Sequence, residues 1–228
     1  MDNPIIKVVV PAQNEERAIG KVISEIPDWV SEVIVADNGS IDATAQVARD
    51  HGATVISVPT PGYGRACLGG IAAAWEYDIL VFLDGDASDY PEDMGALVQP
   101  IRDGEADMVI GSRPLGQLEP GSLTPQQRFG NALACWLIKV IWKHRYTDLG
   151  PFRAISREGL EKLDMQAPTF GWTVEMQIRA LKQGLRCQDV PVRYRKRIGK
   201  SKISGTVKGV VMAGVYILGT IFVEAVRR

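Results

Sequence analysis

Short apolar runs and longer segments of helical periodicity alternate through the first half of this chain. The runs are apolar almost throughout rather than at every second position, which is typical of parallel strands covered on both faces. The runs cover residues 6–10, 32–36, 54–58, 79–83 and 108–110, and the helical segments cover residues 15–26, 42–51, 64–75 and 91–102. This series predicts a single α/β domain with right-handed crossovers and a doubly wound, mostly parallel sheet.

The second half of the 228-residue chain is less regular. Three prolines and two glycines in residues 112–125 predict a loop. We expect helices over about 126–143 and over 172–182, and strands near 152–155 and over 187–194.

The C-terminal segment, residues 205–228, predicts an apolar helix. Its residues 209–223 are 15 uncharged, mostly apolar positions, whereas a bilayer span needs about 20. Such a helix can complete the core, form a dimer interface or lie on a membrane surface, and the sequence leaves these alternatives open.

Charge is distributed unevenly along the chain. The net charge is −13 over residues 1–111 and +12 over residues 112–228, although the whole chain carries only −1. This asymmetry predicts a protein that handles an anion or a metal–anion complex between two unlike halves. Residues 193–208 hold seven bases and no acid. Such a run can be a solvated segment or a flap that closes over phosphates. The near absence of aromatic residues there argues against nucleic acid as a partner.

Several function classes are disfavoured by what the chain lacks. The three cysteines are far apart and form no CxxC pair, which indicates neither a disulfide framework nor a zinc site. The short apolar run at the N-terminus has no basic residues before it, so we expect a cytoplasmic protein without a signal peptide. The glycine-rich residues 62–70 lack the ending of a phosphate loop and do not follow the first strand, which argues against a nucleoside triphosphatase or a dehydrogenase.

Polar residues follow the predicted strands, at the edge where open parallel sheets bind ligands. Asp84, Gly85 and Asp86 come directly after an apolar run, and two such carboxylates suit Mg²⁺ or Mn²⁺ held jointly with substrate phosphates. The alternative, a solvated turn, is disfavoured by the position after a buried strand. Asp37 and Glu15 follow two other strands, where each can bind a nucleotide or serve as a turn or helix cap.

Six short motifs in a fixed order carry a resemblance to a known family. They are PAQNE at 11–15, DNGSID at 37–42, DGD at 84–86, GSR at 111–113, DLGPFR at 148–153 and GKSK at 199–202. Together they resemble the family-2 inverting glycosyltransferases, in particular the branch similar to dolichyl-phosphate mannosyltransferase. The resemblance implies a Rossmann-like GT-A fold that takes a nucleoside-diphospho sugar, a UDP- or GDP-sugar, together with Mg²⁺ or Mn²⁺.

The resemblance also implies how the chain is organised. Residues 1–204 would form the GT-A domain and residues 205–228 the apolar C-terminal helix. Within the domain, residues 1–111 would bind the donor nucleotide and metal, and residues 112–204 would face the acceptor, with a basic flap at 193–204.

Roles for single residues follow from their matching positions. The donor would contact Pro11, Gln13, Glu15, Val35, Asp37, Asp84, Gly85 and Arg113, and the metal would be held by Asp84, Asp86 and Ser88. The acceptor or its phosphate would face Arg128, Arg195, Arg197 and Lys202, and the catalytic set would be Asp86, Glu175 and Asp148.

The resemblance implies transfer of one sugar per encounter, because the Gln-x-x-Arg-Trp signature of processive synthases is absent.

A polyprenyl phosphate acceptor at the cytoplasmic membrane face would need no strong base, since phosphate is ionised at neutral pH. Glu175 or Asp148 would then only position groups. A soluble hydroxyl acceptor would need a base, for which Glu175 is the candidate. A non-catalytic nucleotide-sugar-binding subunit is the third alternative, against which Asp84 and Asp86 argue. Homo-oligomerisation is also compatible with the sequence.

Overall fold

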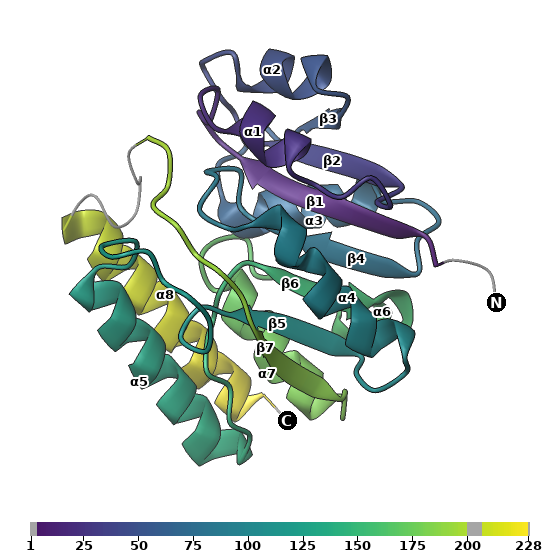
Figure 1. Ribbon diagram of the computed structural model, residues 1–228. Helices are drawn as coiled ribbons and strands as arrows, with labels where there is room; N and C mark the ends of the chain where they lie inside the picture. The colour runs from purple at the N-terminus through teal and green to yellow at the C-terminus, as the bar shows by residue number, and fades with distance from the viewer. Residues whose placement is uncertain (1–3, 200–206, 228) are drawn as a thin grey trace.

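A mixed sheet of seven strands crosses the centre of the structure (Figure 1). The computed structural model describes residues 4–199 and 207–227. The strand order is β3-β2-β1-β4-β6-β5-β7, and β6 is antiparallel to both neighbours while the other pairs are parallel. The mostly parallel sheet predicted above is confirmed. The strands are β1 (Ile6–Ala12), β2 (Glu32–Asp37), β3 (Thr54–Ser57), β4 (Ile79–Phe82), β5 (Met108–Ser112), β6 (Arg153–Ser156) and β7 (Cys187–Pro191).

Helices cover both faces of the sheet (Figure 1). On β1, Val8 and Val10 pack with residues of α1, α2 and α4, whereas Val9 packs on the opposite face with residues of α3, α5, α6 and α7. Successive side chains of a strand alternate between faces, and both faces are buried here, which explains why the runs are apolar throughout. The helices are α1 (Ile19–Ser24), α2 (Thr44–Asp50), α3 (Tyr63–Ala73), the 3₁₀ turn η1 (Pro91–Asp93), α4 (Met94–Arg102), α5 (Pro125–Trp142), α6 (Arg157–Leu163), α7 (Trp172–Lys182) and α8 (Val207–Val226).

Helix α1 begins at Ile19 rather than at residue 15, because the chain first makes a turn. Asn14 has a φ of +51°, in the left-handed region that asparagine tolerates. Its amide donates to Ser40 Oγ at 2.8 Å, and its own side-chain oxygen accepts from the Ile41 amide at 2.8 Å. The turns after β1 and β2 are thereby tied together, which places Glu15 at the sheet edge.

Helix α6 was not predicted. The Ser156 side chain caps it by accepting from the Gly159 amide at 3.1 Å, and Leu160 and Leu163 are buried. Its seven residues are too few to establish a helical period in the sequence. The expected last strand also ends early, at Pro191 rather than at residue 194, because the Arg193 amide donates to Asp93 instead of continuing the ladder.

Helix α8 lies beside α5 and also packs on α7 (Figure 1). It occupies most of the segment in which a C-terminal helix was expected. Within residues 4–199 and 207–227, no helix is both long and apolar enough to span a bilayer.

Candidate active site

A cavity of about 530 Å³ opens at the sheet edge where β1 and β4 end. Among the described residues, its walls come from those strand ends, the start of α3, the segment before α7, the chain after β7 and helix α8. The predicted residues that line it are Pro11, Gln13, Glu15, Asp84, Gly85, Asp86 and Arg197. The structure thus brings together residues that are up to 186 positions apart, from Pro11 to Arg197.

Three carboxylates gather after β4. Asp84 and Asp86 line the cavity, and Asp89 is buried beside them, with its Oδ2 accepting from the Asp84 amide at 3.4 Å. Burial and the charge of Asp86 raise the pKa of Asp84 to about 7. Burial and the charges of Asp84 and Asp86 raise the pKa of Asp89 well above its ordinary value. These shifts follow from the burial of the carboxyl groups and from the crowding of like charges.

The donor set of this cluster fits a divalent cation. Oδ1 of Asp84 and Oδ1 of Asp89 are buried and make no hydrogen bond within the described part of the chain, and unpaired buried carboxylate oxygens are costly unless a cation satisfies them. No group of three or more His, Cys, Asp or Glu residues among those described could itself hold a metal. The protein would therefore supply few ligands and leave the rest to substrate phosphates and water, as is usual for Mg²⁺.

Asp86 is held in place by neighbours on two sides. Its Oδ1 accepts from the Ser88 hydroxyl at 2.5 Å and from the Ser88 amide at 2.9 Å, while its Oδ2 lies 3.1 Å from Arg197 Nη1. Arg197 Nη2 also donates to Glu15 Oε1 at 2.8 Å. Ser88 therefore orients the carboxylate, and Arg197 provides the positive charge opposite it.

Arg113 and Asp148 form a buried pair. The Arg113 side chain donates to both carboxylate oxygens at 2.7 Å, and the Arg113 amide donates to Asp148 Oδ2 at 2.9 Å. Burial alone would lower the pKa of Arg113, but the charge of Asp148 and these bonds raise it well above the ordinary value. The guanidinium also lies 5.1 Å from the Tyr194 ring centroid. Both carboxylate oxygens of Asp148 therefore bind Arg113, which orients the guanidinium and keeps it protonated.

The first part of the basic segment is paired with acids from several elements. Arg193 contacts Asp93, Arg195 contacts Glu25, Lys196 contacts Glu119, and Arg197 contacts Glu15 and Asp86. Arg193 and Arg195 also stack on the Tyr90 ring, at 4.3 and 4.4 Å from its centroid. Residues 193–197 therefore form a strap across the sheet edge rather than a solvated segment. Residues 200–204 of the predicted flap, including Lys202, lie outside the described residues.

Other predicted site residues are not among those described as lining the cavity. Val35 is fully buried in the core beside Val10, and Asp37 accepts from the Ser40 amide at 3.2 Å. Arg195 donates to the Ala87 carbonyl and pairs with Glu25. Arg128 is exposed on α5. In these cases the position matched to the family did not indicate where the side chain lies relative to the cavity.

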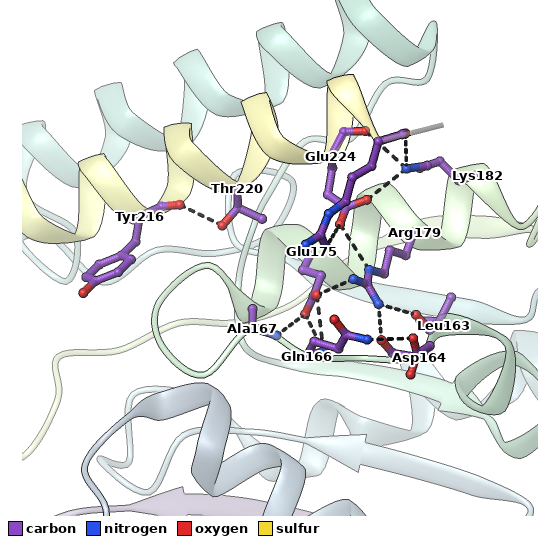
Figure 2. Close-up of polar contacts among 11 residues, drawn as sticks. Leu163, Asp164, Gln166, Ala167, Glu175, Arg179, Lys182, Tyr216, Thr220 and Glu224 are labelled. Atoms are coloured by element: carbon purple, nitrogen blue, oxygen red, sulfur yellow. Dashed lines mark hydrogen bonds and ion pairs between the residues drawn. The ribbon is translucent and has the colours of Figure 1, made fainter.

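Glu175 is also absent from the described cavity lining. It is 3% exposed, and its carboxylate accepts hydrogen bonds from the Gln166 and Ala167 amides and pairs with Arg179 (Figure 2).

Asn38 lines the cavity and was left out of the predicted site residues. Its buried amide donates to the carbonyls of Val58 and Thr60 at 2.9 Å and accepts from the Gly62 amide at 2.7 Å. These bonds hold the chain that leads into α3, where Tyr63 lines the cavity. The position of Asn38 after a strand was visible in the sequence, whereas the partners 20 to 24 residues away were not. For Asp89, the available signal was a third aspartate five residues after Asp84.

Comparison with known proteins decides the family. Residues 7–170 match the family model described as glycosyl transferase family 2. The chain belongs to this family. An uncharacterized glycosyltransferase of Mycobacterium tuberculosis is 34% identical over 215 residues, which cover 93% of this chain and 96% of that protein. The undecaprenyl-phosphate mannosyltransferase of Micrococcus luteus is 28% identical over 229 residues, with 92% of each chain covered.

The fold is similar to that of a solved glucosyl-3-phosphoglycerate synthase. The glucosyl-3-phosphoglycerate synthase of Mycobacterium tuberculosis, crystallised with Mn²⁺, uridine diphosphate and phosphoglyceric acid, superposes with a TM-score of 0.79. The two chains are 28% identical, and the match covers 98% of this chain and 79% of the synthase. The GT-A fold and the glycosyltransferase activity implied by the sequence motifs are confirmed.

Proposed function

We propose that this glycosyltransferase moves one sugar from a UDP- or GDP-sugar to a polyprenyl phosphate at a membrane surface, with Mg²⁺ or Mn²⁺ held at Asp84 and Asp86. Support for the donor and cation comes from the carboxylate cluster in the cavity and from the synthase whose crystals contain Mn²⁺ and uridine diphosphate. Pro11, Gln13 and Glu15 would contact the nucleotide, in keeping with their places in the cavity wall. Residues 1–111 would then serve the donor and residues 112–204 the acceptor.

The chemistry assigned to the chain is mainly electrostatic. A bound cation would neutralise charge that develops on the leaving diphosphate. Arg197 faces the cavity beside Asp86 and would add a positive charge near the same oxygens. Arg113, held charged by Asp148, would contribute from behind the carboxylates. Fixed charges in a partly desolvated site stabilise a transition state without having to reorganise.

The apolar wall of the cavity carries the proposal of a lipid acceptor. Phe170, Met212 and Tyr216 line it opposite the strand ends. Met212 and Tyr216 also belong to a row of exposed apolar residues along α8 that continues with Val215, Phe222, Val223 and Val226. With 3.6 residues per turn these positions fall on one side of the helix, so they form one face. A polyprenyl chain could lie along this face while its phosphate enters the cavity.

The neighbouring helix α5 adds exposed aromatic and basic residues. Phe129, Trp136 and Val140 are exposed and lie seven and four residues apart, on one side of α5. Residues 120–147 contain no acid, and Arg128, Lys139, Lys143 and Arg145 are exposed there. Apolar rings surrounded by bases are suited to contact with an anionic bilayer. We therefore propose that the α5–α8 surface rests on the membrane.

A soluble acceptor is the second candidate. The specific observation in its favour is the likeness to the synthase crystallised with phosphoglyceric acid. In that case the cavity would take a small phosphorylated acceptor, and the α8 face would serve another purpose, such as a homodimer contact.

Turnover with a panel of donors and acceptors tests the proposal. The purified protein would be incubated with UDP- and GDP-sugars, Mn²⁺, and either undecaprenyl phosphate in phosphatidylglycerol vesicles or 3-phosphoglycerate in solution. Transfer to the lipid alone supports the proposal, transfer to 3-phosphoglycerate alone supports the second candidate, and donor binding without any transfer would contradict both.

A further inference from the structure

Glu175 lies at the centre of a polar cluster outside the cavity (Figure 2). Its Oε2 accepts from the Ala167 amide at 2.7 Å and from the Gln166 amide at 3.1 Å, and its Oε1 lies 3.0 Å from Arg179 Nη2. The residue is 3% exposed. A general base needs a free lone pair directed at the substrate, and both oxygens of this carboxylate are already engaged with the protein.

Arg179 extends the cluster to two further elements. It donates to the carbonyl oxygens of Leu163, at 3.0 Å, and of Asp164, where α6 ends. On its other side it lies 3.3 Å from Glu224 Oε1 in α8, and Lys182 lies 3.0 Å from Glu224 Oε2. Asp164 has a φ of +47°, in the left-handed region, and ends α6, so Arg179 binds the chain at the point where it leaves the helix. We call Glu175, Arg179, Lys182 and Glu224 the latch.

The segment held by the latch forms part of the cavity wall. Its Pro168 carbonyl accepts from the Arg65 amide at 3.1 Å, and a Cβ added to Gly64 would lie 1.9 Å from the Ala167 oxygen. The segment is therefore in direct backbone contact with the start of α3. The next two residues, Thr169 and Phe170, line the cavity.

Helix α8 is fixed against the same segment. A Cβ added to Gly171 would lie 2.2 Å from Thr220 Oγ1, so α8 touches the backbone at the start of α7. The phenyl ring of Phe170 and the ring of Tyr216 are 6.3 Å apart, edge to face. Because Glu224 ties α8 to Arg179 and Lys182, the latch holds both the segment with Phe170 and the helix with Tyr216.

We propose that Glu175 and Arg179 are positioning residues that place Phe170 and Tyr216 at the acceptor end of the cavity, and that Glu175 is not the catalytic base. The inference rests on the proposed function in that the cavity is taken as the site of transfer. It predicts that weakening the latch changes acceptor binding, leaves donor binding unchanged and does not alter the pH dependence of turnover.

Kinetics of latch variants test this role. Glu175→Gln and Glu224→Gln would be compared with Glu161→Gln, which breaks an exposed Glu–Arg pair of the same spacing on α6. We expect both latch variants to raise the acceptor KM about tenfold or more, with donor KM and kcat within about threefold of wild type and an unchanged pH profile. A loss of kcat of about a thousandfold in Glu175→Gln, at unchanged acceptor KM and with the basic group missing from the pH profile, would overturn the inference.

Amide hydrogen exchange gives a second readout that does not depend on turnover. In Glu175→Gln the amides of Gln166 and Ala167 should exchange at least tenfold faster than in wild type, while those of β1 stay protected. Unchanged exchange at Gln166 and Ala167 would contradict a latch. If Glu175→Gln does not fold, Glu224→Gln is measured instead. Faster amide exchange at the start of α7 is expected in that variant, and unchanged exchange there would contradict the latch. A wild-type protein without any transferase activity would refute the proposed function and leave this readout intact.

Discussion

The guanidinium of Arg197 lies 3.1 Å from Asp86 and 2.8 Å from Glu15, so one base of the second half pairs with two acids of the first half. Other bases of the second half also pair with acids of the first, such as Arg193 with Asp93 and Arg195 with Glu25, but Arg197 is the one described as lining the cavity. The same contact places Arg197 opposite Asp86 at the cavity wall. Under the proposed function, Arg197 would share that carboxylate with the cation.

Arg197→Ala should separate competition with the cation for Asp86 from stabilisation of the leaving group. Without the competing guanidinium, the affinity for Mn²⁺ in the absence of donor should rise a few-fold, as measured by calorimetry. The kcat should nevertheless fall by roughly a hundredfold, because a fixed charge near the leaving group is lost. Arg193→Ala is the matched control, since Arg193 belongs to the same strap but pairs with Asp93. Weaker Mn²⁺ binding in Arg197→Ala would show that Arg197 does not compete with the cation.

Asp89→Asn should stabilise the metal-free protein. Burial and two neighbouring aspartates raise the pKa of Asp89, so its charged form is disfavoured in the folded state and removing the charge relieves repulsion. We expect the free energy of unfolding in urea at neutral pH to rise by about 1–2 kcal/mol. The exposed Asp103→Asn should change it by less than about 0.5 kcal/mol. A clear loss of stability in Asp89→Asn would mean that this carboxylate stabilises the fold.

Glu224→Gln should destabilise the protein in a pH-dependent way. Burial raises the pKa of Glu224, but the hydrogen bond from Lys182 and the charges of Arg179 and Lys182 outweigh it, so the pKa lies below the ordinary 4.5. A carboxylate with a lowered pKa adds stability above its unfolded pKa, and this stability is lost as pH falls through the folded pKa. Urea titrations should show a cost of about 1 kcal/mol at neutral pH that vanishes in acid. A difference that stays constant down to about pH 3 would rule out the ionic contribution.

Phe222→Glu and Trp136→Glu should weaken binding to phosphatidylglycerol vesicles. Both rings are exposed on the α5–α8 surface, and a charge there would oppose insertion into the headgroup region. Sedimentation with vesicles should show about a tenfold lower partition coefficient for each variant. Trp75→Glu, an equally exposed ring elsewhere, is the control. Equal effects of all three substitutions would argue against a defined membrane surface.

The sequence was most informative where a residue's role follows from the strand that precedes it. Asp84 and Asp86 were predicted at the sheet edge because they follow a buried run, and both lie in the cavity. The parallel strands were predicted for the same reason, since continuous apolar runs reflect burial on two faces.

Contacts between distant segments could not be predicted in the same way. Glu175 is held by the Gln166 and Ala167 amides and by Arg179, and Arg179 in turn pairs with Glu224 in α8, a helix that begins more than 30 residues after Glu175. A carboxylate at a motif position fits a base and a structural anchor equally well until those partners are known. Arg195 is a similar case, because its partner Glu25 is 170 residues away. Helix α6 and the antiparallel direction of β6 could not be predicted either. Both elements are too short to show a clear period, and packing in the folded chain decides where they lie.

Sugar transfer to a lipid phosphate, measured with and without a divalent cation, tests whether the carboxylates after β4 support catalysis through a metal. The wild-type protein and Asp86→Asn would be incubated with radiolabelled UDP- and GDP-sugars and undecaprenyl phosphate in vesicles, with either Mn²⁺ or excess EDTA. The account predicts labelled lipid only for wild type with Mn²⁺, and a loss of at least about a hundredfold in EDTA or in Asp86→Asn. Equal transfer by Asp86→Asn, or by wild type in EDTA, would contradict it.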